Sequence, residues 1–312
     1  MTAPDSRRAA QRLAVACLVA HAALITFSAV AFATFLTGAP PAWLQSPANQ
    51  RMLALGWRFG PATTVVLGAL AGALHAGGRL GARRAAAIFV GAFAVSLGAE
   101  LAGTSTGYPF GPYSYTPLLG YRVAGLVPFN IPTSWFYMLY CALAMTARMR
   151  GTRGSRWGWA ALAGLTLTAW DVSMDPAMVR TAHWLWHLAP PTSTLHRVFV
   201  SDAFYGMPLS NWLGWLLTGT LVARLMLAIV PPAAWLERVA PTRLPLVLYA
   251  VNGILPLTIC ARYGMWWAFA LGAAAMVLPL AMSLRARARA SAAAPDAVPN
   301  AARSGGRGVA TA

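Results

Sequence analysis

The sequence predicts an all-α protein that crosses a membrane several times, and three observations support this prediction. Of the 312 residues, 58% are hydrophobic and only 10% are charged. Several apolar runs reach about 17 to 25 residues, the length with which a helix spans the hydrocarbon core of a bilayer. The basic residues gather mostly in the short segments between these runs and in the tails. We therefore expect a polytopic bundle of transmembrane helices.

The apolar windows predict eight spans, with seven as the alternative count. The first window, 13–36, is longer than the apolar segment of a cleaved signal peptide, so we expect it to remain as a helix. Residues 1–284 then form one integral-membrane domain with a motif-bearing core at about 85–230, and the basic tail 285–312 is expected to be disordered. The other windows are 61–76, 85–103, 127–147, 157–172, 208–229, 244–261 and 264–283.

Arginine alone supplies the 24 basic residues, and its distribution predicts how the helices are oriented. With the N-terminus in the cytoplasm, 18 of the 24 arginines fall on that side, which is the arrangement that the positive-inside rule favours. We therefore expect both termini inside, an even number of spans and a location in the cell's inner membrane. Because these loops and tails account for most of the net charge of +17, we expect no nucleic-acid partner.

Four of the seven acidic residues gather at the opposite, outer face. Glu100 lies near the outer end of the third span, Asp171 and Asp175 at the outer end of the fifth, and Asp202 shortly before the sixth. A spacing of four residues places the carboxyl groups of Asp171 and Asp175 on one helical face, and we expect that helix to kink or end at Pro176. Since an ionisable side chain costs at least about 2.5 kcal/mol at the centre of a span, each acid is a functional candidate.

Two segments on the same face, 103–135 and 175–215, are rich in Gly, Pro and aromatic residues but carry few charges. Irregular backbone at membrane depth is tolerated where it lines a cavity, so we expect both to be partly buried. Any single aromatic residue here is explained as well by the core or by an interfacial aromatic belt. With two asparagines that could hold a water molecule, the expected substrate-binding set is Tyr108, Phe110, Tyr113, Tyr115, Asn130, Trp135, Trp170, Trp184, Tyr205, Asn211 and Trp212.

Several chemistries could use the acids. The DxxxD pair has the spacing with which magnesium binds prenyl diphosphates, although a second acid-rich motif is missing. His183 and His187 are spaced as metal ligands often are, but five histidines are too few for the boxes of membrane di-iron enzymes, and we expect no metal site. A carboxyl group in an apolar, aromatic cavity could instead protonate an alkene, and aromatic rings would stabilise the carbocation. The acids could also pair with Arg122, Arg180 or Arg197 in a purely structural role.

Four motifs follow one another along the chain: ELAGTSTGYPFGPYSYT, VPFNIPTSWFYMLY, WDVSMDPAMV and FYGMPLSNWLGW. In this order and separation, over about residues 85–230, they resemble the CruF family of carotenoid hydratases, which includes the bisanhydrobacterioruberin hydratases of haloarchaea. The resemblance implies a hydro-lyase that adds water to the terminal carbon–carbon double bond of an acyclic ψ end group without a cofactor. The substrate would be a membrane-dissolved carotene such as lycopene, γ-carotene or a fifty-carbon bisanhydrobacterioruberin type, with other carotenoid-pathway enzymes as expected partners.

For this reaction the chemistry of the side chains predicts their roles. We expect Asp171 to be the general acid, because the apolar stretch before it excludes water. Glu100 and Asp202 are expected to activate or orient the water, and Asp175 to be structural or a partner of Arg180. Two other functions remain open: a membrane prenyltransferase acting on carotenoids or isoprenoids, and a proton-coupled lipid transporter that uses the acids as a relay.

Overall fold

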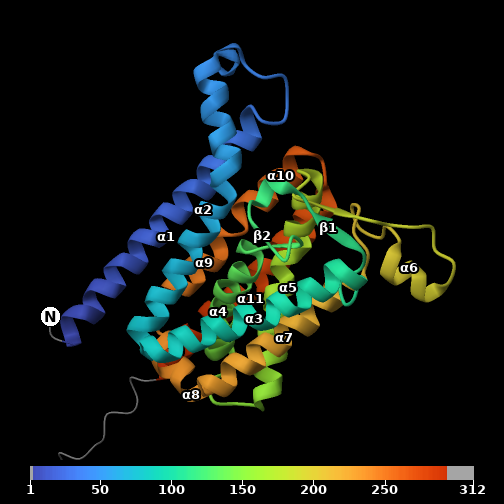
Figure 1. Ribbon diagram of the computed structural model, residues 1–312. Helices are drawn as coiled ribbons and strands as arrows, with labels where there is room; N and C mark the ends of the chain where they lie inside the picture. The colour runs from blue at the N-terminus through green and yellow to red at the C-terminus, as the bar shows by residue number, and fades with distance from the viewer. Residues whose placement is uncertain (1–2, 294–312) are drawn as a thin grey trace, which may run out of the picture.

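The computed structural model describes residues 3–293 and is 76% helical, which confirms the predicted all-α polytopic bundle (Figure 1). In chain order the long helices are α1 (Ala3–Thr34), α2 (Pro47–Leu80), α3 (Ala82–Thr106), α4 (Asn130–Arg150), α5 (Arg156–Arg180), α7 (Ser210–Ile229), the consecutive pair α9 (Leu244–Val251) and α10 (Ile254–Arg262), and α11 (Trp266–Ala293). They run alternately in opposite directions and are joined at the two ends of the bundle, by long connections between α3 and α4 and between α5 and α7.

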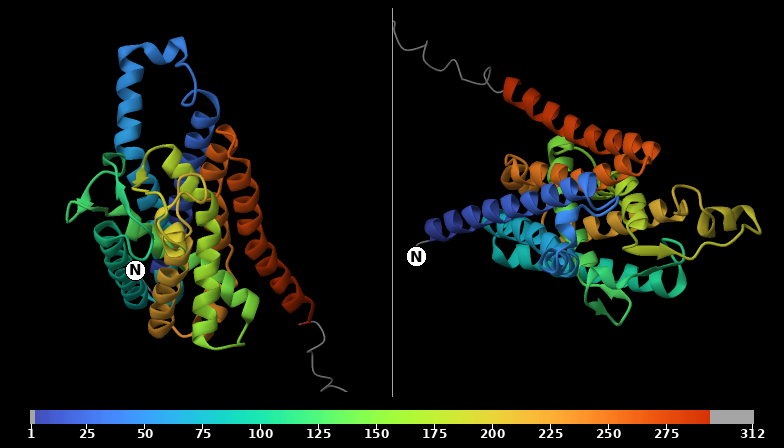
Figure 2. Two further views of the ribbon diagram at one scale, coloured as in Figure 1. Left: turned by 90° about the vertical axis from the view of Figure 1, so that its right-hand side faces the viewer. Right: turned by 90° about the horizontal axis from the view of Figure 1, so that it is seen from above.

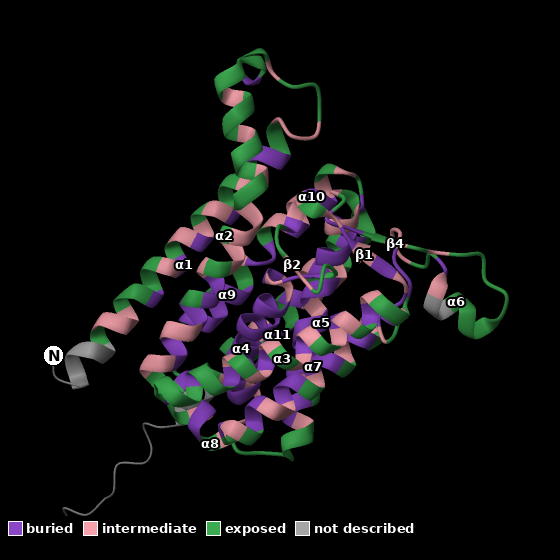
Figure 3. Cartoon of the chain, in the orientation of Figure 1, coloured by how far each residue is buried: buried purple, intermediate pink, exposed green. Residues whose placement is uncertain are grey.

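Within residues 3–293, six helical segments are long and apolar enough to cross a membrane, and the chain is a multi-pass membrane protein. Helices α4 and α5 are not among the six. Nearly every residue of α4 from Asn130 to Arg148 is buried, and α5 packs against α4, α7, α10 and α11 (Figure 3). A helix that faces other helices can carry polar side chains that a lipid-facing helix cannot. The count of eight spans therefore stays a prediction.

Several helices are longer than the predicted windows, and two of them continue past a proline. Helix α2 begins at Pro47, well before residue 61, and Pro61 lies inside it. Helix α5 does not end at Pro176 but continues to Arg180. Neighbouring helices and local adjustments satisfy the carbonyl groups that an internal proline leaves free, which is why a proline signal overstates the chance of a helix end in such a bundle.

The connections form short elements. Two-stranded pairing joins the segments 103–135 and 175–215, because Tyr113 pairs with Trp186 and Tyr115 with Trp184. The short elements at the same end of the bundle as this strand pair are η1 (Ala42–Gln45), β1 (Tyr113–Tyr115), η2 (Pro117–Leu119), β2 (Arg122–Val123), β3 (Val127–Pro128), β4 (Trp184–Trp186) and α6 (Thr194–Val200). At the opposite end lie α8 (Pro232–Ala234) and the π-helical turn η3 (Trp235–Val239).

Helices α5 and α7 make the closest helix contact that bears on the site. A Cβ atom at Gly164 of α5 would lie 2.7 Å from Oγ1 and 2.9 Å from the backbone N of Thr220 in α7. On the other side, a Cβ atom at Gly219 would lie 3.2 Å from Cα of Gly164. The two glycines therefore let the backbones touch, which brings the side chains of α5 and α7 within hydrogen-bond reach about two to three turns further along.

The two ends of the described chain lie at the same end of the bundle, opposite the β-strands (Figures 1 and 2). The α2–α3, α4–α5 and α7–α9 connections, which carry clustered arginines, lie there too. Of the tail that the sequence predicts to be disordered, residues 285–293 instead form the last turns of α11, because the alanine and arginine there favour helix. Residues 294–312 lie outside the described part of the chain.

Candidate active site

Glu100 of α3 is held by three side-chain donors and is only 3% exposed. Its Oε2 atom accepts hydrogen bonds from the hydroxyl of Tyr113 and, at 2.8 Å, from the hydroxyl of Tyr115. Its Oε1 atom accepts a hydrogen bond of 3.1 Å from the indole N–H of Trp135. Burial, reinforced by the negative charge of Glu100, raises the pKa of both tyrosines well above its usual value, so their hydroxyls stay protonated as donors.

Asp171 and Asp175 lie one turn apart on α5 and share a single donor from α7. The side-chain amide of Asn211 donates to Oδ2 of Asp171 at 2.9 Å and also to Oδ2 of Asp175. Both carboxyl groups are buried, and Oδ1 of Asp171 has no hydrogen-bond partner among the described residues. Arg180, the partner suggested by the sequence, lies instead over the ring of Tyr263, with its guanidinium carbon 4.3 Å from the ring centroid.

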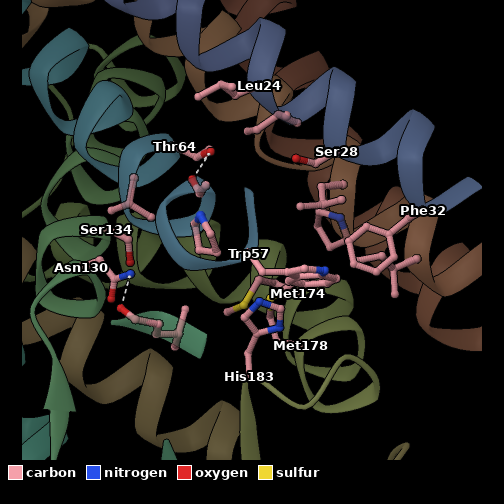
Figure 4. A pocket seen from close by; sticks show the side chains of 18 of the residues that line it. Leu24, Ser28, Phe32, Trp57, Thr64, Asn130, Ser134, Met174, Met178 and His183 are labelled. Carbon is pink, nitrogen blue, oxygen red and sulfur yellow. Dashed lines mark hydrogen bonds between the residues drawn. The ribbon is translucent and has the colours of Figure 1, made fainter. Parts of the chain in front are cut away.

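A cavity of about 520 Å³ connects these acids. Glu100, Asp175 and Asn211 line it at one end, while Asp171 stands behind Asn211 and does not line it. Most of the remaining wall is apolar, with contributions from α1, α2, α4, α5, β1, β4, α7 and the α9–α10 segment. Figure 4 shows Leu24, Ser28 and Phe32 of α1 and Thr64 of α2 on one side, and Asn130, Ser134 and Met174 on the other. The charged side chains that line the cavity are thus buried acids within an apolar enclosure.

Aromatic rings cover the wall next to the acids. Trp215 of α7 stacks on Trp135 with ring centroids 4.5 Å apart and meets Trp170 of α5 edge to face at 6.0 Å. The β1–β4 pairing adds Tyr113 against Trp186 and Tyr115 against Trp184. Since the faces of such rings carry negative potential, this wall can stabilise a cation that forms in the cavity.

His183, between α5 and β4, forms the part of the wall that meets α2. Its Nδ1 atom lies 2.8 Å from Oγ1 of Thr181, and its ring lies 6.4 Å from that of Trp57. Burial lowers the pKa of His183 to about 4, so the ring is neutral at ordinary pH. His187 has a different neighbour, Ser114, whose hydroxyl oxygen lies 2.8 Å from its Nε2 atom. The two histidines are therefore not arranged as a pair.

The structure brings most of the sequence-predicted residues together. Trp135 does not line the cavity but donates a hydrogen bond to Glu100, which does. Asp171 does not line the cavity either and contacts Asn211, which does. The predicted residues that line the cavity directly are Glu100, Phe110, Tyr113, Tyr115, Asn130, Trp170, Asp175, Trp184 and Asn211.

Four further residues that the sequence predicts at the site lie outside the cavity. Asp202 is exposed, and its Oδ1 atom accepts a hydrogen bond of 2.9 Å from the backbone N–H of Gly206. Tyr108 is 65% exposed, and the hydroxyl of Tyr205 accepts a hydrogen bond from the backbone of Trp267. Trp212 packs on Phe204, with ring centroids 5.1 Å apart. Their nearness to the acids in sequence does not place them at the site, because each lies on a loop or helix face that turns away from the cavity.

Sequence reasoning missed Trp215, Trp57 and the apolar faces of α1 and α2, all of which line the cavity. Helical periodicity could have found Trp215, since it lies four residues after Asn211 and so on the same face, whereas Trp212 is displaced by about 100° around the helix. No comparable signal marks the α1 and α2 residues, which reach the site only through tertiary packing.

Comparison with known proteins gives two matches. The family described as carotenoid biosynthesis proteins matches residues 60–279. The bisanhydrobacterioruberin hydratase of Haloarcula japonica is 31% identical over 144 residues, which cover 46% of this chain and 45% of that protein. The aligned part is thus less than half of either chain. No solved structure matches this chain.

Proposed function

We propose that this chain, which belongs to the carotenoid biosynthesis protein family, is a hydratase that adds water to the terminal carbon–carbon double bond of an acyclic carotene. The observation that carries the proposal is the cavity itself, in which buried acids adjoin an apolar, aromatic wall. Hydration of an isolated alkene needs a strong proton donor and a place for a tertiary carbocation, and it needs no electron transfer. The partial match to a hydratase in Haloarcula japonica supports the same reaction.

In the proposed first step, the carboxyl group of Asp175 gives its proton to the less substituted carbon of the double bond. The π electrons form the new C–H bond, and the positive charge is left on the neighbouring tertiary carbon. Asp175 suits this role because it lines the cavity beside its partner Asp171. Two like charges this close repel each other, so the pair favours retaining one proton between them.

The second step is capture of the cation by water. Oxygen of a water molecule forms the new C–O bond, and the water loses a proton, so the net change is alkene plus water to tertiary alcohol. Glu100 suits the role of base and electrostatic partner, since three donors stabilise its carboxylate form and it lines the same cavity. Return of the proton to Asp175 completes the cycle.

Asp171 thus has a different role from the one that the sequence suggests. Because it does not line the cavity, we assign it to positioning Asn211 and to sharing the proton of Asp175. Trp215 and Trp170 lie at the wall where the cation would form, and they contribute cation–π stabilisation of about 0.5 to 2 kcal/mol each. We place the enzyme in the cell's inner membrane, where the carotene and the other enzymes of its biosynthesis would meet it.

The direct test is expression in a bacterial host that accumulates lycopene, followed by chromatography and mass spectrometry of the extracted pigments. We expect products heavier by one or two molecules of water that behave as tertiary alcohols on silylation. Unchanged pigment, in cells with verified membrane expression and with γ-carotene and fifty-carbon acyclic carotenes as further substrates, would contradict the proposal.

The Asp171–Asp175 spacing keeps a second function in view, a prenyltransferase acting on carotenoids. That reaction would depend on magnesium and a prenyl diphosphate, and its product would be heavier by a prenyl group rather than by water. No arginine is among the described residues that line the cavity, so the cavity offers no cationic side chain to a diphosphate, which favours the hydratase. Proton-coupled uptake by vesicles, with the carotene chemically unchanged, would instead indicate a transporter.

A further inference from the structure

The cavity does not end at the acids but continues between α1 and α2. Residues between 24 and 36, in α1 and directly after it, and residues of α2 between 49 and 65 line this continuation, which we call the hairpin slot. On α2 the lining positions include Leu53, Gly56, Trp57, Gly60 and Thr64, spaced by one, three or four residues along one helical face. The outer part of this helix hairpin extends beyond the rest of the bundle (Figure 1).

The slot is elongated. Sixteen residues separate the first and last lining positions on α2, Asn49 and Val65, which corresponds to about 24 Å along the helix. A cavity of about 520 Å³ that extends over at least this length has room for an extended hydrocarbon chain.

The two ends of the slot differ in exposure. Near the hairpin tip, the lining residues Trp43 and Met52 are 54% and 70% exposed. At the inner end, Glu100 and Asp175 are each 3% exposed. The slot therefore leads from an exposed surface to the buried acids, with a mainly apolar wall between them.

Two glycines on α2 leave the middle of the slot open. Gly56 and Gly60 both line it, and a Cβ atom built at either would meet no other heavy atom within 4 Å. A glycine inside a helix costs roughly 1 kcal/mol relative to alanine. No helix-packing contact accounts for glycine at these two positions, whereas Gly164 and Gly219 serve such a contact. Space in the slot is the property that they provide.

We propose that the hairpin slot holds the polyene chain of one acyclic carotene lengthwise, with its reacting end at Asp175 and its far end leaving past Met52 into the bilayer. The inference rests on the proposed hydratase function and adds where the unreactive part of the substrate lies. A rigid, extended polyene matches an elongated, mainly apolar slot that ends at the acids. Since the family match begins at residue 60, most of the slot lies outside it.

The test compares leucine substitutions at glycines of one helix. Gly60→Leu and Gly56→Leu place a side chain in the slot, with a Cβ atom that meets nothing within 4 Å, and Gly77→Leu is the matched control because a Cβ atom there is equally free but Gly77 does not line the cavity. Each is made in the wild-type chain, to measure hydration, and in an Asp175→Asn chain, to measure lycopene that co-purifies per molecule of protein. We expect hydration activity and co-purified lycopene each to fall at least about tenfold in both slot variants, which corresponds to about 1.4 kcal/mol. Both quantities should be unchanged in the control.

Each outcome decides the proposal. If Gly60→Leu and Gly56→Leu bind and convert the carotene as the wild type does, or if Gly77→Leu loses as much as they do, the slot is not the binding site. If these two variants lose co-purified phospholipid but bind as much carotene as the wild type does, the slot holds a phospholipid, and the proposal is wrong. If the wild type binds lycopene in a slot-dependent way but forms no alcohol, the slot stands and the hydratase function fails.

Discussion

Asp175 is the residue on which the proposed reaction depends most. Asp175→Asn keeps the size of the side chain and its contact with Asn211 but removes the proton donor. General acid catalysis contributes about 10²- to 10⁴-fold, so we expect hydration of lycopene to fall by at least about 100-fold. The measurement is product per molecule of membrane-inserted protein. Glu237→Gln, at an exposed acid in η3 at the opposite end of the bundle, is the control and should keep full activity.

Activity above about a tenth of wild type in Asp175→Asn would rule out this residue as the donor. Loss of activity in Asp171→Asn alone would then return the role to Asp171, as the sequence suggests. A normal level of folded protein in both variants separates catalysis from stability.

His183 makes stability depend on pH through its lowered pKa. The pKa is about 4 in the folded protein and about 6.5 when unfolded, so below pH 6.5 the unfolded chain takes up a proton that the folded chain does not. The free energy of unfolding is therefore complete above pH 6.5 and decreases as pH falls toward 4, by about 2 kcal/mol between pH 7 and pH 5.

Thermal unfolding in detergent at a series of pH values measures this dependence. We expect His183→Gln to flatten the decrease below pH 6.5, while His196→Gln, at an exposed histidine of α6, keeps it. If stability falls with pH in His183→Gln as steeply as in the wild type, other groups produce the acid sensitivity.

At the scale of the elements, the α5–α7 contact determines whether the acid pair and Asn211 meet. The added methyl group in Gly164→Ala would lie 2.7 to 3.1 Å from side-chain and backbone atoms of α7 and would force the helices apart. Overpacking of this kind costs about 1 to 3 kcal/mol, and it would separate Asp171 and Asp175 from their shared donor. We expect lower thermal stability and at least about tenfold lower hydration.

Gly77→Ala is the matched control for this contact, since it adds the same methyl group to a helix where a Cβ atom meets nothing within 4 Å. It should be neutral or slightly stabilising. If Gly164→Ala has the same thermal stability and hydration activity as Gly77→Ala, the close approach of α5 and α7 is not what positions the site.

At the scale of the whole molecule, the helices alternate in direction, and the start of α1 and the end of α11 lie at the same end of the bundle. This arrangement predicts that both termini lie on one side of the membrane. The clustered arginines of the α2–α3 and α4–α5 connections predict that this side is the cytoplasm. Reporter fusions that are active on only one side of the membrane, placed after residues 81, 153 and 293, should all report cytoplasm. A fusion after residue 191, between β4 and α6, should report the opposite side.

Opposite signals from the fusions at 81 and 293 would exclude an even number of spans between these positions. A cytoplasmic signal at 191 would show that α5 does not cross the membrane. The second result would also place Asp171 and Asp175, near the end of α5, on the cytoplasmic side.

The sequence alone predicted the membrane class, the approximate place of the long helices and the acids Glu100, Asp171 and Asp175 as neighbours. These properties depend on composition and on periodicity within one segment, which can be read locally. The spacing of Asp171 and Asp175 puts both on one helical face whatever surrounds the helix. The motifs from 85 to 230 also indicated the carotenoid family, which the match to residues 60–279 confirms.

Tertiary structure alone decided which of these residues face the cavity. Asp175 lines it while Asp171 stands behind Asn211, Trp215 belongs to it and Trp212 does not, and Asp202 lies outside on an exposed loop. A shift of one residue turns a helical side chain by about 100°, so nearness in sequence does not determine direction. The hairpin slot joins α1 and α2 to acids on α3 and α5, and such long-range packing leaves no local pattern from which it could be predicted.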